Sequence, residues 1–102
     1  MALLDGMNHL ASVTIDLTRL TTFYRDIFEA PIIAELDEDG LRHAMVQLGP
    51  NTVLHAFEIL DGVSPTGPHP MFQRGRLDHF GLNARSEEAF HELRRRTFAA
   101  AA

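Results

Sequence analysis

The feature that most constrains this chain is a pattern near its start that returns near its end. Residues 6–28 read GMNHLASVTIDLTRLTTFYRDIF, and residues 75–96 read GRLDHFGLNARSEEAFHELRRR. In each copy a short apolar run that begins with histidine is followed by a segment with helical spacing. The two histidines are His9 and His79, and the same offset places Leu10 opposite Phe80. The pattern predicts a duplicated module.

The first copy predicts a strand and a helix. β-Branched residues suit a strand from His9 to Asp16. Apolar residues then recur at i, i+3, i+4, i+7 and i+8 from Leu20 to Phe28, which is the spacing of an amphipathic helix. We expect Thr18 to be its N-cap and Pro31 to lie just beyond its end.

Three apolar runs follow and predict two hairpins in series. They span Pro31–Leu36, Leu41–Leu48 and Thr52–Leu60, and the turn sequences DEDG and GPN separate them. Residues 61–76 are rich in proline and glycine, which disfavours a helix or a long strand. This segment is therefore expected to be a connector.

The second copy predicts a strand over Leu77–Ala84 and then a helix. Ser86 is placed to cap that helix, with glutamates in the first turn and three arginines, Arg94–Arg96, in the last. The chain thus reads as an α+β fold in one compact domain. Residues 1–60 form a βαβββ module, 61–76 the connector, and 77–102 the first strand and helix of a second, truncated module.

Composition excludes several classes of protein. At 102 residues and 45% hydrophobic, the chain suits one soluble domain with a single core. A formal charge of −5 disfavours nucleic-acid partners. No cysteine is present, which removes disulfides and thiolate metal sites and fits a cytoplasmic protein. The start MALLDG is too short for a signal peptide or a membrane span, so we expect no membrane partner.

Six histidines in so short a chain raise the question of a metal site. His69 falls in the connector and His91 on the second helix, where we expect both to be solvated. His43 and His55 fall within strands, where each either lines a pocket or occupies a half-buried face. These four are second-rank candidates.

His9 and His79 begin equivalent strands of the repeated module, and a duplication would bring them together. Glu58 closes an otherwise apolar strand and shares a face with Leu54 and Ala56. Two histidines and one carboxylate make a facial triad that leaves positions open on iron, manganese, nickel or zinc. The alternative is that Glu58 points to solvent and the histidines bond to backbone carbonyls.

The sequence resembles the vicinal oxygen chelate superfamily, which includes glyoxalase I, extradiol dioxygenases, and fosfomycin- and bleomycin-resistance proteins. NHLASVTIDLTRLTTFYRDIFEAP resembles the first strand and helix, HAFEIL the fourth strand, and LDHFGLNARSEEAFHELRRR the start of the second module. The resemblance implies that His9, Glu58 and His79 are the metal ligands, with Glu58 as a candidate catalytic carboxylate. Family members usually complete the second module, whereas this sequence ends at Ala102, so we expect a truncated or incompletely described chain.

The resemblance also implies a function. It points to a metal-dependent enzyme, a lyase or isomerase of glyoxalase type or an extradiol-type dioxygenase, acting on a small substrate with adjacent oxygens. The cofactor would be a divalent ion, iron, nickel, manganese or zinc, and the chain would pair as a homodimer. The alternative is a metal-independent protein that binds and sequesters a drug, as bleomycin-resistance proteins do, and the acidic balance of the chain would suit a cationic drug.

Overall fold

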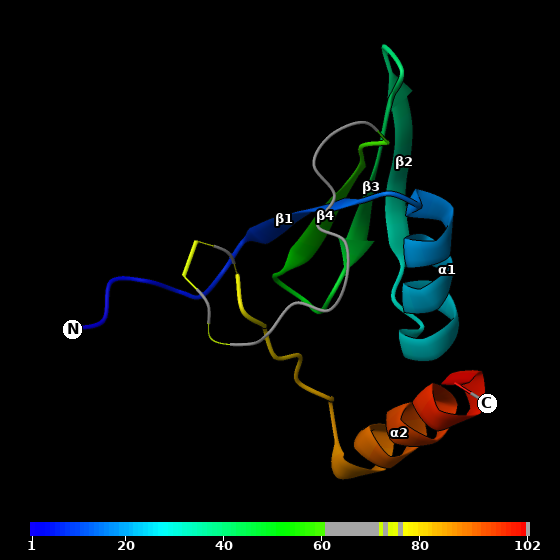
Figure 1. Cartoon of the computed structure of the whole chain (residues 1–102). Helices are drawn as coiled ribbons and strands as arrows, with labels where there is room; N and C mark the ends of the chain where they lie inside the picture. The colour runs from blue at the N-terminus through cyan, green and yellow to red at the C-terminus, as the bar shows by residue number, and fades with distance from the viewer. Residues whose placement is uncertain (61–71, 73, 76, 102) are drawn as a thin grey trace.

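A mixed four-stranded sheet and two helices make up the fold in the computed structural model (Figure 1). The structure describes residues 1–60, 72, 74, 75 and 77–101. The elements in chain order are β1 (His9–Thr14), α1 (Leu17–Phe28), β2 (Ile32–Glu38), β3 (Leu41–Gln47), β4 (Val53–Glu58) and α2 (Glu87–Ala101). The predicted α+β class and the βαβββ order of the first module are confirmed.

The strand order across the sheet is β1-β4-β3-β2. β1 runs parallel to β4, and the other neighbours are antiparallel. Because β1 and β2 lie at opposite edges, the chain must cross the sheet between them, and α1 makes that crossing along one face (Figure 1). The three predicted strands after the helix are thus present, each within two residues of its expected bounds.

The core lies between α1 and the middle of the sheet. Val46 of β3 and Leu54 of β4 are at most 2% exposed, and Leu17 of α1 packs against Ala44 and Ala56 from the same two strands. Full burial of a side chain such as Leu54 contributes about 1.5–3 kcal/mol. One face of the sheet is therefore committed to packing against α1.

The start of α1 differs from the prediction. Asp16, not Thr18, is the N-cap, because Asp16 has an extended backbone (φ −147°) and its Oδ1 accepts the Arg19 N–H at 3.0 Å. Thr18 already lies in the first helical turn. At the other end Glu29 adopts a left-handed φ of 54° and closes the helix just before Pro31, as expected.

The second copy forms its helix but not its strand. Residues 77–84 form no strand, and the chain leads away from the sheet toward α2 (Figure 1). A strand needs a hydrogen-bonded neighbour, and among the described residues β1 pairs only with β4. The connector expected over 61–76 lies mostly outside the described residues, and so does His69.

The capping prediction for α2 is confirmed, since Ser86 Oγ accepts the Ala89 N–H at 3.0 Å. The three arginines are not in the last turn, because the alanine-rich end continues the helix to Ala101. Arg96 instead pairs with Glu92 of its own helix and with Glu29, just after α1. Neither helix in the described ranges has the length and apolar character that a bilayer crossing requires.

Candidate ligand and metal site

The strand registers divide the side chains of the sheet between two faces. Side chains of directly paired residues point the same way, and they alternate along each strand. Arg42 pairs with Glu58, Ala44 with Ala56 and Val46 with Leu54, so these six side chains share the face that packs on α1, the helix face. The opposite face carries three histidines and is here named the histidine face. In these three strands its members are His9, Ala11 and Val13 of β1, Leu41, His43, Met45 and Gln47 of β3, and Val53, His55 and Phe57 of β4.

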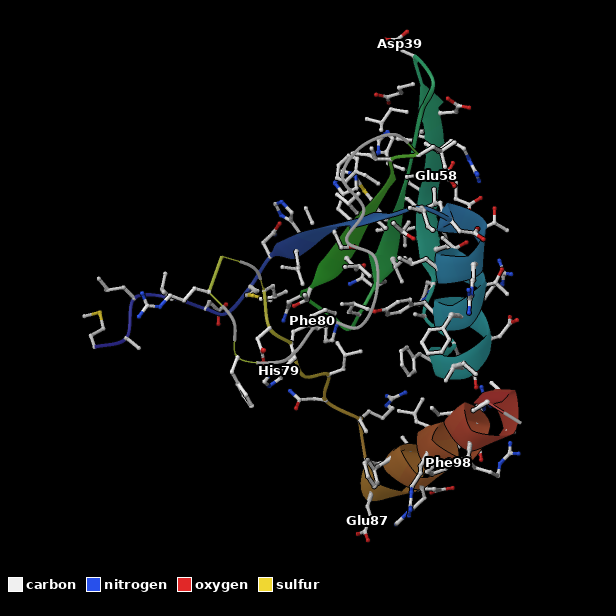
Figure 2. The ribbon with its side chains drawn as sticks, in the orientation of Figure 1. Asp39, Glu58, His79, Phe80, Glu87 and Phe98 are labelled. Carbon is white, nitrogen blue, oxygen red and sulfur yellow. The ribbon has the colours of Figure 1, made fainter. Side chains whose placement is uncertain are left out.

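Glu58 lies on the helix face together with Leu54 and Ala56, as the alternation along the strand predicts. Its Oε2 accepts the backbone N–H of Leu17 at 2.9 Å and pairs with Arg42 Nη1 at 3.2 Å. The side chain is 12% exposed, so it does not point to solvent. Figure 2 shows Glu58 near the beginning of α1. The carboxylate therefore satisfies a free N–H in the first turn of that helix.

His9 lies at the start of β1 on the histidine face, where its Nδ1 is 2.9 Å from Asn8 Oδ1. His79 lies on the segment between the sheet and α2, pairs with Asp78 and is 67% exposed (Figure 2). His9 and Glu58 are on opposite faces, and at opposite ends of the paired strands β1 and β4. The arrangement does not bring these two side chains to one ion. The ligand set of His9, Glu58 and His79 stays a prediction.

The structure instead brings together two of the second-rank histidines. His43 Nδ1 and His55 Nε2 are 2.9 Å apart on the histidine face. The side chain of His43 is 10% exposed, and its Nε2 is 3.8 Å from Glu38 Oε2. In the part of the chain that the structure describes, no three or more histidine, cysteine or acidic side chains are grouped so as to hold a metal ion.

Phe57 adds an aromatic ring to the pair. It stacks on His43 at 8° between planes and 5.5 Å between centroids, and its centroid is 4.2 Å from that of His55. Burial lowers the pKa of His55 below its usual value, and the neighbouring charges of His43 and His9 lower it further. The lowered pKa favours the neutral form of His55.

The family comparison agrees with this fold. Residues 6–100 match the model of the Glyoxalase/Bleomycin resistance protein/Dioxygenase superfamily. The chain belongs to this superfamily. A comparison with curated proteins finds no match. Membership gives the scaffold on which the histidine face is built, and one scaffold supports many reactions.

The sequence could predict only part of the arrangement of His43 and His55. Leu54 and Ala56 mark one face of β4, so strand alternation puts His55 and Phe57 on the other. The register of β3 against β4 is what places His43 beside them, and alternation within a single strand does not give a register.

Proposed function

We propose that this chain binds a small substrate with adjacent oxygen atoms on the histidine face, in a metal-dependent reaction of glyoxalase or dioxygenase type. The observation that supports the proposal is the gathering of His9, His43 and His55 on the face opposite α1. Imidazole is a common ligand for zinc, iron and nickel. When bound, a divalent ion would act as a Lewis acid and stabilise negative charge on the substrate oxygens.

The protein's own part is to bind and orient the substrate. Phe57 and the imidazoles beside it form a cluster of aromatic rings against which a small planar molecule can pack. On the other face the core and the Glu58 contacts hold β4 against α1. Because β4 is held against α1, the side chains on its opposite face have fixed positions, as a binding site requires.

Acetohydroxamate, which has two adjacent oxygens, is a suitable probe. We expect it to bind nickel-loaded protein in a calorimetric titration and to lose binding after EDTA treatment. His55→Ala should abolish binding, whereas His91→Ala, on the surface of α2, should leave it unchanged. Probe binding that survives His55→Ala would contradict the proposal.

A metal-free binder is the second candidate. The ring cluster of His43, His55 and Phe57 and the net charge of −5 would also suit a flat cationic drug. Such a protein would bind a bleomycin-type drug tightly, and its affinity for the drug would be the same with and without EDTA. The same calorimetric titration therefore separates the two candidates.

We also propose that the chain acts as a homodimer. Val13 and Ile15, in and just after β1, are 65% and 64% exposed, and β1 forms an edge of the sheet. Exposed apolar side chains on an edge strand favour association with another strand. Sedimentation velocity should give a mass twice that of the monomer. The Val13→Lys variant, which carries a charge at this edge, should give the mass of the monomer.

A further inference from the structure

The outer edge of β2 is open to a further strand. β2 is the last strand of the sheet, and among the described residues it pairs only with β3. Along such an edge, every second residue directs its N–H and C=O groups away from the sheet, where another strand can bind them. We propose that β2 binds an extended peptide segment of a partner protein in which basic and apolar residues alternate. This inference goes beyond the proposed reaction and does not depend on it.

The side chains of β2 determine the chemistry of that segment. Glu35 pairs with Ala44 and Asp37 with Arg42, so both carboxylates lie on the helix face. Leu36, between them, points to the histidine face and is 42% exposed. A strand added beside β2 continues the same alternation. Its basic side chains would therefore lie beside the two carboxylates, and its apolar side chains beside Leu36.

The two carboxylates are available to a basic partner. Glu35 and Asp37 are both exposed. Arg42 lies opposite Asp37 in the register, but its guanidinium donates to Glu58 at 3.2 Å and to Thr18 at 3.2 Å. Within the described ranges, no ion pair joins Glu35 or Asp37 to another side chain. A lysine or arginine of the partner can therefore pair with either carboxylate without displacing an existing contact.

An open groove of about 730 Å³ lies beside the first half of this edge. It is lined by Arg25 and Glu29 from the end of α1 and by the residues from Ala30 to Glu35. Ile33, which is 53% exposed, lies in this groove at the point where the register of β2 shifts. From there to the end of β2 the pairing with β3 is regular. The regular part can extend the sheet, and the groove has room for an apolar side chain of the partner.

Charge disfavours a second copy of this chain as the occupant. If the regular part of β2 paired with itself in antiparallel orientation, Glu35 would lie beside Asp37 of the second copy. Like charges directly opposite one another on a sheet are destabilising. A basic segment turns that repulsion into attraction. The same acidic side chains thus oppose self-association and select the partner.

The test is a chemical-shift titration of the ¹⁵N-labelled protein with a blocked peptide of alternating lysine and valine, four lysines in all. We expect the backbone amides of residues 34–38 to shift and those of β1, at the opposite edge, to stay in place. Two control peptides, one with glutamate for lysine and one with the same residues but the valines grouped, should bind about 10-fold more weakly or worse. N-methyl groups on either the lysine or the valine amides block one edge of the peptide, and one of these two peptides should lose binding.

Charge-reversal variants test the two carboxylates. A variant with both Glu35→Lys and Asp37→Lys should bind the lysine peptide about 10-fold more weakly and should bind the glutamate peptide instead. That gain of binding also shows that the variant is folded. The matched control combines Glu87→Lys with Glu88→Lys, which changes the net charge equally at the start of α2. It should bind the lysine peptide as the parent does, because Glu87 lies far from the β2–β3 turn at Asp39 (Figure 2).

Three results would overturn the inference. Equal binding of the alternating and grouped lysine peptides would mean that net charge alone attracts them. Shifts at β1 or α2 without shifts at residues 34–38 would place the peptide elsewhere. Shifts of residues 34–38 that follow the protein concentration without peptide would assign the edge to a second copy.

Discussion

Replacing Glu58 by glutamine tests the structural role of this carboxylate. The carboxylate accepts the Leu17 N–H at 2.9 Å and is only 12% exposed. Hydrogen bonds to a charged group contribute about 1.5–3 kcal/mol, against about 0.5–1.5 kcal/mol for a neutral pair. The ion pair with Arg42, whose side chain is 43% exposed, adds about 1 kcal/mol or less. Because the glutamine amide oxygen can still accept the N–H, we expect a net loss of about 1–2 kcal/mol.

The assay is thermal unfolding of metal-free protein, followed by urea unfolding. At about 4–8 °C for each kcal/mol in a domain of this size, a loss of about 1–2 kcal/mol should lower Tm by roughly 4–16 °C. Glu35→Gln is the matched control, since Glu35 is an exposed glutamate on β2, and it should change stability by no more than about 0.5 kcal/mol. A Glu58→Gln variant as stable as the parent would refute the argument and would favour Glu58 as a free ligand.

Three further outcomes follow from the packing, the caps and the charges. Leu54→Ala should cost about 2–5 kcal/mol in urea unfolding, because Leu54 is 2% exposed in the core; a loss under 1 kcal/mol would contradict this. Asp16→Ala should cost about 1 kcal/mol by loss of the α1 cap, while Thr18→Ala should cost less; the reverse order would restore Thr18 as the cap. Hydrogen bonds from Arg95 and Arg96 lower the pKa of Glu92 from 4.5 to about 2, so its stabilising contribution is present above pH 4.5 and lost toward pH 2. The Tm of Glu92→Gln should therefore lie below that of the parent at pH 6 and approach it near pH 2; equal values at pH 6 would contradict the role of Glu92.

Much of the fold could be predicted because its signals are local. The spacing from Leu20 to Phe28 marks α1, and turn residues such as Gly40 separate the strands. The prediction of a strand over residues 77–84 was wrong, because strand formation depends on a neighbouring strand as well as on the segment's own residues. The prediction that Ser86 caps α2 is confirmed. The prediction that Thr18 caps α1 was wrong, because Asp16, two residues earlier, takes that role.

The site could be predicted only in part. The face shared by Glu58, Leu54 and Ala56 follows from alternation, and the structure confirms it. Which face binds a ligand does not follow, because this depends on where α1 packs. The contact between His43 and His55 depends on the register of two strands, which a single sequence specifies only weakly.

The most direct test of the account is a methyl NMR titration of the protein with Zn²⁺ and then acetohydroxamate. The central claim is that the histidine face, not the helix face, carries the binding site. The account predicts that the methyl signals of Ala11 and Met45, on the histidine face, shift on each addition, while those of Ala44 and Ala56, beneath α1, stay in place. Shifts confined to Ala44 and Ala56, or no shift at any of the four methyls, would contradict it.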